Sequence, residues 1–481
     1  MKIVHAAGEL FPYIKTGGLA DVVGATTRTL AEYGHEVAVF LPGYRSILDH
    51  PDMVNAKRLC SFGVDMGSDI QKGEVLSLNI RKNLTLHLVC RDEYFDRSYP
   101  YGRPDRDYDD NAERFIFFSK AVVEVLIRTS LKPDIVHCHD WQAALVPILV
   151  RIEERRRASA IAGKTVFTIH NLAFQGIFPR KVFGLTNLPD ELLSMDGLEF
   201  YGQVNLLKGG ILFSDSLTTV SPTYAREILT PEFGCGMDGV LALRSEDLVS
   251  ILNGIDYEVW NPETDPYLPA TYSVSNLKGK NACRRALLLK CGMDEGYTGP
   301  VFGIISRFTQ QKGIDILLET KDFFSGDRAR LILLGNGSTE YRRRSVEFAK
   351  ANDGVVYLGP RHDEAVSHLI EAGSDFFLMP SVFEPCGLNQ MYSQRYGTIP
   401  LVSRVGGLAD TVVDIGEFPD EGTGIQFPPS DPEAFRKALE RAVTLFEDKK
   451  KMAGVIERAM KKDFSWKTAA RAYEKLYTEI L

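Results

Sequence analysis

Apolar and polar positions follow two periods that alternate along almost the whole chain. Short runs of apolar, largely β-branched residues are followed by stretches in which apolar residues recur at helical spacing. The alternation is typical of parallel sheets whose strands are joined by crossover helices. The predicted strands are residues 3–7, 37–41, 84–89, 135–138, 166–169 and 216–220, then 249–252, 301–306, 331–334, 355–358, 376–379 and 401–403. The predicted helices are residues 19–33, 111–129, 313–324, 363–372, 388–396 and 432–446.

Several predicted strands are continuous apolar runs, among them VFGIIS, LILLG and DFFLMP. Strands of this kind are covered on both faces, so the pattern predicts an α/β fold with two doubly wound parallel-sheet domains. The segment 253–272 is rich in Pro, Asn and Asp and has no clear period, which places a linker or crossing loop near it. The sequence GGLAD occurs at 17–21 and again at 406–410, and it opens a helix pattern each time. Two similar halves and chance recurrence both explain this repeat.

Composition narrows the class of protein. The 481 residues correspond to about three domains or two large ones. Lys and Arg number 56 and Asp and Glu 64, a net charge of −8 that argues against nucleic-acid binding. The 7 cysteines form no CxxC pair and fit reduced thiols. His5 and Glu9 interrupt the apolar start, and no apolar run reaches the roughly 18 residues of a membrane helix. We therefore expect a cytoplasmic protein with neither nucleic-acid nor membrane partners.

Three motifs look functional but have simpler interpretations. Residues 234–239 match GxGxxG, yet no predicted strand precedes them, so we expect a turn. His137 and His139 flank Cys138 and share one face of a strand, but no second ligand pair is nearby, so we expect no metal. The acidic run 107–110 is interpreted as the N-terminal cap of the helix that follows it.

Two clusters carry the chemistry of anion binding. The first follows the first predicted strand, where Lys15 precedes Gly17, Gly18 and Asp21; a phosphate-binding loop and a plain glycine turn both fit it. In the second half, Arg307 and Lys312 follow the strand 301–306. Cations at the carboxyl end of a parallel strand lie where open α/β sheets bind ligands, and Arg and Lys both bind phosphate oxygens.

A third cluster combines a carboxylate with a helix start. Glu384 follows the strand 376–379, and Gly387 and Leu388 are predicted to begin the next helix. A carboxylate beside an anion-binding helix start suggests sugar hydroxyls on one side and a diphosphate on the other. In the first half, the runs HDW at 139–141 and IHN at 169–171 end predicted strands and supply directional polar contacts for a hydroxyl-rich ligand.

The motifs KTGGLADV, HDW, IHNLAFQG, NGID, SRFTQQKG, FEPCGLNQMY, RYGTIP and GGLADTV resemble those of bacterial glycogen synthases and starch synthases, in order over essentially the whole chain. The resemblance implies the GT-B fold: two Rossmann-like domains facing a deep cleft, with a C-terminal helix that crosses back to the first. We expect an N-terminal domain over 1–248, a nucleotide-sugar domain over 249–460 and the returning helix over 461–481. It also implies retaining transfer of glucose from ADP-glucose to an α-1,4-glucan, without a metal or another cofactor.

Matching positions carry the site residues of that family. The resemblance implies that the diphosphate is bound by Lys15, Gly17 and Gly18, with Asp21 close by, and by Arg307 and Lys312 as it leaves. It places four residues of the third cluster at the donor glucose: Glu384, Cys386, Gly387 and Leu388. It places His170 at the reacting face of the sugar, and Asp140, Tyr94 and Asn171 on the catalytic or acceptor side. Asn253 is placed in the cleft and Thr411 near the phosphate. His362 stands where bacterial members often have a Tyr that stacks on adenine, which leaves ADP against UDP preference open.

Other classes of function remain alternatives. A related glycosyltransferase or an epimerase would use a different sugar nucleotide, and a glucan-binding protein without activity would bind polysaccharide but release no ADP. A phosphorylase would need pyridoxal phosphate on a lysine. Within the glycogen synthase interpretation, the mechanism is front-face displacement, in which the leaving diphosphate takes the proton of the acceptor.

Overall fold

The computed structural model describes residues 1–103, 106–129, 131–320, 322–359 and 363–481. They form two compact units. The first consists of Met1–Val220, Ala225–Asn253 and Trp466–Leu481, and the second of Ser221–Tyr224 and Gly254–Ser465. The main boundary lies after Asn253, beyond the residue 248 expected from the sequence, and the chain returns to the first unit at Trp466 rather than at residue 461.

The first unit is built on a nine-stranded sheet, with the order β14-β13-β9-β8-β1-β2-β5-β4-β3. The parallel strands are β1 (Lys2–Ala6), β2 (Glu36–Pro42), β5 (Leu84–Cys90), β8 (Ile135–His139), β9 (Lys164–Ile169), β13 (Ser216–Thr219) and β14 (Leu248–Ser250). The chain builds outward from β1 through β2 to β5, then returns to the other side of β1 at β8. The loops after β1 and β8 therefore flank a topological switch point, where ligands of such sheets bind.

Two features of this sheet differ from the prediction. The strand expected at 249–252 opens no second domain, because β14 pairs with β13 in the first sheet. The antiparallel strands β3 (Lys57–Met66) and β4 (Asp69–Arg81) were not predicted at all. In β3 only Phe62, Val64 and Met66 are buried, so the strand lacks the continuous apolar run that marks the central strands.

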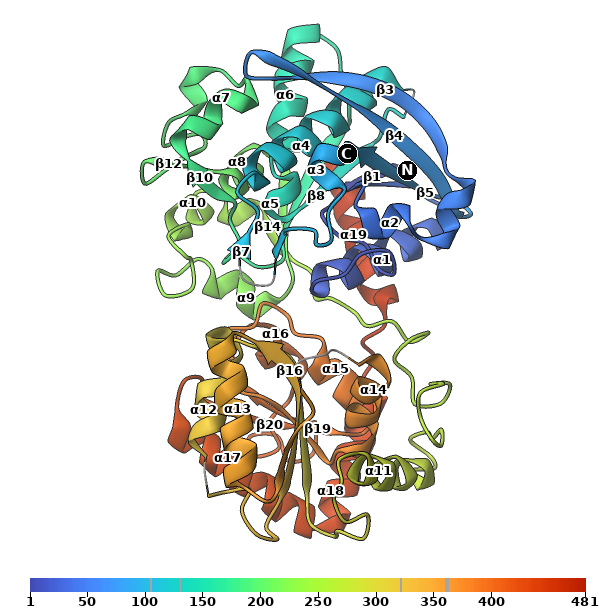
Figure 1. The fold of residues 1–481 in the computed structure, drawn as a ribbon, viewed down its shortest axis with the longest axis vertical. Helices are drawn as coiled ribbons and strands as arrows, with labels where there is room; N and C mark the ends of the chain where they lie inside the picture. The colour runs from blue at the N-terminus through green and yellow to red at the C-terminus, as the bar shows by residue number, and fades with distance from the viewer. Residues whose placement is uncertain (104–105, 130, 321, 360–362) are drawn as a thin grey trace. The chain divides into compact units, whose positions relative to one another are not determined.

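Helices cover the first sheet, and the last one comes from the far end of the chain. The longer ones are α1 (Gly18–Glu32), α4 (Asn111–Arg128), α6 (Val146–Arg157), α8 (Leu206–Phe213) and α19 (Trp466–Ile480); the short ones are α2 (Arg45–Leu48), α3 (Asp92–Phe95), α5 (Asp140–Ala143), α7 (Phe183–Thr186) and α10 (Asp238–Ala242). Figure 1 shows α19, in red, among the blue elements of this unit, and it packs against α1. The Tyr477 hydroxyl of α19 lies 2.7 Å from Nδ1 of the buried His137.

The second unit is built on a six-stranded parallel sheet, with the order β17-β16-β15-β18-β19-β20. Its strands are β15 (Val301–Phe308), β16 (Arg330–Gly337), β17 (Val355–Tyr357), β18 (Phe376–Met379), β19 (Ile399–Ser403) and β20 (Ile425–Phe427). Leu334, Phe377 and Val402 are buried in one hydrophobic cluster that includes the helix residues Leu287 and Ile370. The switch point of this sheet lies between β15 and β18.

Eight helices surround this sheet among the described residues, and three of them were not predicted. They are α11 (Lys278–Lys290), α12 (Ile314–Glu319), α13 (Thr339–Ala351), α14 (Glu364–Gly373), α15 (Asn389–Arg395), α16 (Gly406–Thr411), α17 (Pro432–Glu447) and α18 (Lys449–Lys461); α11, α13 and α18 are the unpredicted ones. The helix expected at 313–324 ends at Glu319. Asp448 separates α17 from α18, because its carboxylate caps the second helix through the amide of Lys451, at 3.0 Å.

The two GGLAD segments do not occupy equivalent positions in the two units. The first begins α1 after β1, the first strand of its sheet, and the second begins α16 after β19, the fifth strand of its sheet. The repeat is therefore no sign of duplication, although both units share one strand order. In the described part of the chain, no helix combines the length and the apolar character that crossing a bilayer requires.

Candidate active site

In the second unit, the loops that follow β15, β18 and β19 pack directly against one another. The amide of Val382 donates to the Gln311 carbonyl at 2.8 Å, and the amide of Gly407 donates to the Glu384 carbonyl at 3.1 Å. Glycine is required at two of these contacts. A Cβ on Gly313 (φ +64) would lie 1.7 Å from the Pro380 oxygen, and one on Gly406 (φ +41) would lie 1.9 Å from the Glu384 oxygen.

A buried ion pair lies in the middle of these loops. Nζ of Lys312, in the short 3-10 helix η5 (Gln310–Lys312), is 2.5 Å from Oε2 of Glu384, and the Ser381 hydroxyl donates to the same oxygen at 3.0 Å. The side chains of Lys312 and Glu384 are 19% and 7% exposed. The pair explains how a carboxylate persists beside a site predicted to bind an anion, because the ammonium neutralises it.

The remaining candidates of this unit lie on β15 and in the segment that leads into α15. Arg307 is exposed near the end of β15. Gly387 has φ +72, and the helix expected to begin at 387–388 begins at Asn389 instead, with Leu388 as its N-cap. The buried Gln390 amide donates to the carbonyls of Cys386 and Gly387, at 3.0 and 3.1 Å.

Thr411 and His362 stand apart from the other candidates. Thr411 is 1% exposed; its hydroxyl donates to the Gly407 carbonyl at 2.5 Å and accepts from the Gln390 amide at 3.0 Å. The contact with Gln390 connects α16 to α15. His362 lies outside the described residues.

In the first unit, a buried carboxylate organises the loop after β1. Glu9 is 3% exposed and accepts from the amide of Thr16 (2.6 Å), the Thr16 hydroxyl (2.5 Å), the amide of Gly17 (3.3 Å) and the Tyr101 hydroxyl (2.9 Å). One of the amides that we expected to face an anion, that of Gly17, is thus already bonded, so the helix-start amides left to an anion begin at Gly18.

Lys15 and Asp21 form an ion pair at the exposed end of this loop. Nζ of Lys15 lies 2.9 Å from Oδ1 of Asp21, and the two side chains are 39% and 19% exposed. Because a pair this exposed contributes little to stability, Lys15 can reorient toward a ligand at low cost.

On the other side of the same switch point, Asp140 and His170 follow β8 and β9. Asp140 has φ +52, and its Oδ1 accepts from the His170 amide at 2.8 Å. Burial raises the pKa of Asp140 to about 7, which makes this carboxyl able to take or release a proton near neutral pH. Burial lowers the pKa of His170 to about 3, so its imidazole is neutral.

The histidine motif on β8 has a neighbour that the sequence analysis missed. His5 on β1 joins His137 and His139, and ligand nitrogens of the three lie within 4.8 Å of one another. The sequence predicted no second ligand pair, and the structure adds a single further imidazole, because the parallel pairing of β1 with β8 brings His5 beside His137. However, His137 already uses both ring nitrogens, with the Tyr477 hydroxyl at 2.7 Å and the Thr168 hydroxyl at 2.5 Å.

Three further candidates have different surroundings. Tyr94 on α3 is 5% exposed, and its hydroxyl donates to Glu113, so it is part of the interior of this unit. Asn171 bends the loop after β9, because its Oδ1 accepts from the amide of Ala173 at 3.0 Å. Asn253 is 7% exposed, and its Oδ1 has no hydrogen-bond partner among the residues that the structure describes.

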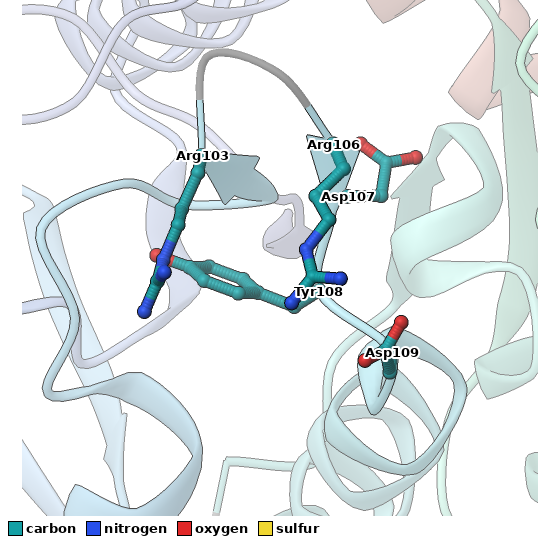
Figure 2. Close-up of a pocket in the computed structure, with 5 residues that line it drawn as sticks. All are labelled: Arg103, Arg106, Asp107, Tyr108 and Asp109. Carbon is teal, nitrogen blue, oxygen red and sulfur yellow. The ribbon is translucent and has the colours of Figure 1, made fainter.

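The acidic run and the GxGxxG match are structural features. Asp110 stands at the N-cap of α4 but does not cap it as predicted, because its carboxylate pairs with Arg97 at 2.5 Å. The hairpin of β6 (Gly102–Arg103) and β7 (Arg106–Asp107) leads into this run. Figure 2 shows the hollow lined by Arg103, Arg106, Asp107, Tyr108 and Asp109, none of which is a candidate site residue. A bend at 234 and a turn at 235–236 occupy the start of the GxGxxG match, as predicted, but α10 begins within it, at Asp238.

Comparisons with known proteins agree along the whole chain. Residues 2–243 match the family model of the starch synthase catalytic domain, and residues 295–462 match that of glycosyl transferases group 1. The glycogen synthase of Opitutus terrae is 55% identical over 481 residues, with 100% of both chains covered. Glycogen synthase 2 of Geobacter sulfurreducens is 42% identical, covering 99% of this chain and 98% of the relative.

The chain belongs to the glycogen synthase family. It is therefore a hexosyltransferase with two Rossmann-like units of the GT-B fold, as the resemblance implied. The catalytic domain of starch synthase IV from Arabidopsis thaliana, solved with ADP and acarbose, superimposes with a TM-score of 0.89 at 35% identity and covers 99% of each chain. A sucrose-phosphate synthase from Thermosynechococcus elongatus, at 16% identity and a TM-score of 0.63, shares the fold.

For a member of this family, the structure gathers the candidates into two groups, one in each unit. Arg307 lies near the end of β15, and Lys312, Glu384, Gly387 and Leu388 lie between β15 or β18 and the helix that follows each strand. Lys15 and His170 follow β1 and β9, whereas Gly18 and Asp21 lie in the first turn of α1 and Asp140 begins α5.

Several residues that hydrogen-bond to members of these groups or their loops were missed by the sequence analysis. They are Glu9, Tyr101, His5, Ser381 and Gln390. A signal was present for Glu9, because a carboxylate that interrupts an apolar run directly after a strand lies at the ligand-binding edge of the sheet.

Proposed function

We propose that this glycogen synthase family member transfers glucose from ADP-glucose to the non-reducing end of an α-1,4-glucan such as glycogen, with retention of configuration and release of ADP. The observation that carries the proposal is the partly buried Lys312–Glu384 pair at the switch point of the second unit, together with the exposed Arg307 near the end of β15. The ADP and acarbose bound to the related starch synthase IV support the choice of nucleotide and acceptor class.

On the donor side, the roles follow from charge and hydrogen-bonding capacity. An ammonium carries three protons. Lys312 can therefore keep its contact with Glu384 while it donates to a diphosphate oxygen. Arg307, with its planar fork of donors, suits the other phosphate oxygens. Glu384, held by Lys312 and Ser381, presents its carboxylate to the hydroxyls of the donor glucose.

In the reaction, the bond between glucose C1 and the diphosphate oxygen breaks, and the acceptor 4-hydroxyl oxygen bonds to C1 on the same face. The proton of that hydroxyl passes to the leaving diphosphate. Arg307, Lys312 and Lys15 stabilise the negative charge on the diphosphate. His170, which is neutral, offers a hydrogen bond to the sugar rather than a positive charge.

A nucleotide-release assay tests the proposal. The protein is incubated with a glucan primer and either ADP-glucose or UDP-glucose, and both nucleotide release and labelled glucose in the polymer are measured. We expect primer-dependent ADP release with equal incorporation of glucose. Release from UDP-glucose alone would assign another donor, and glucan binding without nucleotide release would identify a non-catalytic binding protein.

A further inference from the structure

Three imidazoles form a hydrogen-bonded row that runs from the core of the first unit to the candidate site. Nδ1 of His5 lies 2.9 Å from Nε2 of His139, and Nδ1 of His139 lies 3.0 Å from Nε2 of His170. The three residues come from β1, the end of β8 and the position after β9. Their exposed fractions are 0%, 1% and 9%, so only His170 reaches the open edge.

All three rings are neutral, which restricts how protons can be arranged along the row. Burial lowers the pKa of His5 and of His170 to about 3, and lowers that of His139 well below its ordinary value. A neutral imidazole has one N–H and one bare nitrogen. His139 uses both nitrogens in the row, so it donates through one and accepts through the other. Only two arrangements remain, and they point in opposite directions.

The inner end of the row distinguishes the two directions. If the protons pointed from His170 toward His5, the remaining proton of His5 would sit on Nε2. That nitrogen is buried and has no partner in the described part of the chain, so its N–H group would be buried without a hydrogen-bond acceptor. In the opposite direction His5 donates through Nδ1, and Nε2 is a bare nitrogen. Orphaned buried N–H groups are rarer in proteins than under-satisfied acceptors, which favours the second direction.

We propose that His5 and His139 are positioning residues that fix the tautomer of His170, so that His170 presents an Nδ1–H donor to the ligand at its open side. His5 donates to His139, and His139 donates to Nε2 of His170, which leaves the only proton of the His170 ring on Nδ1. The role of that donor toward the sugar rests on the proposed function, whereas the tautomer itself does not.

A metal site made from His5, His137 and His139 fits the geometry less well. Binding a cation needs a bare nitrogen from each ring. His137 is bonded to the Tyr477 and Thr168 hydroxyls, and both nitrogens of His139 lie in the row. Among the described nitrogens of these three rings, only Nε2 of His5 has no partner. A metal would therefore have to replace several existing hydrogen bonds.

Matched variants distinguish the effect of losing the hydrogen bond from the effect of changing the packing. In His5→Asn, the side-chain amide lies near the original Nδ1 and can still donate to His139. In His5→Phe, a ring of similar size fills the space but has no donor. His139→Asn and His139→Leu form the same kind of pair for the next bond of the row. Thermal unfolding of each variant shows whether it is folded.

The test measures the tautomer directly, from the ¹⁵N NMR signals of the ring nitrogens in the full-length protein labelled with ¹⁵N-histidine. The signals that disappear in His170→Gln are those of His170. We expect a proton on Nδ1 of His170 in the wild type and in His5→Asn, and a mixture of tautomers in His5→Phe and His139→Leu. With ADP-glucose and glucan, we expect kcat to fall about tenfold in His5→Phe, with KM little changed, and to recover in His5→Asn.

Several results would overturn the proposal. They are a proton on Nε2 of His170 in the wild type, an unchanged tautomer in the folded His5→Phe and His139→Leu variants, and zinc binding that shifts the signals of His5, His137 and His139 together. If the protein transferred no glucose but showed the expected tautomers, the proposed function would fail while the positioning roles of His5 and His139 would stand.

Discussion

Lys312 and Glu384 illustrate how one pair of residues couples stability to activity. Glu384 is 5% exposed, so its charge is acceptable only because the ammonium of Lys312 lies 2.5 Å away. Removing one partner leaves the other buried and unpaired, which is more costly than removing both.

The first prediction concerns this pair. Lys312→Ala should lower kcat by about 10²–10³ and destabilise the fold by about 1–3 kcal/mol. The double variant Lys312→Met/Glu384→Gln should recover most of the stability but none of the activity. Urea unfolding and the ADP-release assay measure the two effects. A double variant as unstable as Lys312→Ala would show that the pair does not hold the loops together.

The second prediction concerns Arg307, which is exposed at the same edge. Arg307→Ala should lower kcat by about 10²–10³ without a measurable change in the urea midpoint. Arg307→Lys should recover only part of the rate, because an ammonium lacks the planar fork of a guanidinium. Wild-type turnover in Arg307→Ala would remove this residue from the mechanism.

At the residue scale, the sequence revealed side chains that end strands but not those that support them. Arg307, Lys312 and Glu384 could be predicted because each follows an apolar run. The contacts of Glu9 with Tyr101 and of His5 with His139 could not be predicted, because these partners are distant in the sequence. Such contacts exist only once the register of the sheet is known.

The loops of the second unit depend on glycines that allow close backbone contacts. Gly406 has φ +41, and a Cβ there would overlap the Glu384 carbonyl. By contrast, Gly17 has φ −161, and a Cβ there would meet nothing within 4 Å. Gly406 is therefore required by the close backbone contact with Glu384, whereas no neighbouring atom requires a glycine at position 17.

The third prediction uses this contrast. Gly406→Ala should destabilise the fold by about 1–3 kcal/mol, because the new Cβ forces α16 away from Glu384 and the backbone is strained. Gly17→Ala should leave the urea midpoint unchanged and raise the KM for ADP-glucose, because the added methyl group obstructs a diphosphate approaching the loop. Equal destabilisation of both variants would contradict this account.

At the element scale, central strands were easier to predict than edge strands. The apolar runs at β15, β16 and β18 are continuous because both faces are buried. The hairpin β3–β4 was missed because only one face of β3 is buried. The end of α12 at Glu319 was also missed, since no proline or glycine stands there to mark it.

On the scale of the whole molecule, the buried imidazoles make stability depend on pH. Burial lowers the pKa values of His5, His137, His139 and His170 from the ordinary 6.5, to about 3 for His5 and His170. Their contribution to stability is present above pH 6.5 and is lost as pH falls from 6.5 toward 3. Asp140 acts in the opposite sense, because its pKa rises from 3.8 to about 7 and its folded form gains protons over that range.

Burial also lowers the pKa of His87 to about 4 and raises the pKa values of the Glu371 and Asp375 carboxyls, and the contacts of His368 with Asp265 and Glu364 raise its pKa. The fourth prediction follows from this balance, in which the five imidazoles with lowered pKa values outweigh the groups with raised ones. The free energy of unfolding should fall by at least about 1.4 kcal/mol per pH unit below pH 6. Urea unfolding at pH 7, 6 and 5 measures the slope, and His5→Asn should make it shallower. Stability that is constant or rises on acidification would contradict the burial of neutral rings.

The architecture of the whole molecule followed from the alternation of strands and helices, and both sheets have the expected switch point. The strand order made the candidate loops neighbours within each unit. The exact places where the chain leaves and re-enters the first unit could not be read from the sequence. Ser221–Tyr224 belongs to the second unit because the Asp410 carboxylate accepts from the Thr223 amide at 2.8 Å, a contact between distant segments.

The return of α19 to the first unit has a consequence for biosynthesis. Tyr473 and Tyr477 are buried, at 1% and 0% exposure, and Tyr477 bonds His137 on a central strand. While the ribosome is still translating the second unit, the nascent N-terminal part therefore lacks a piece of its own core. Domains of many proteins finish folding in the order of synthesis. Here the part made first becomes complete only after Trp466–Ile480 has been synthesised.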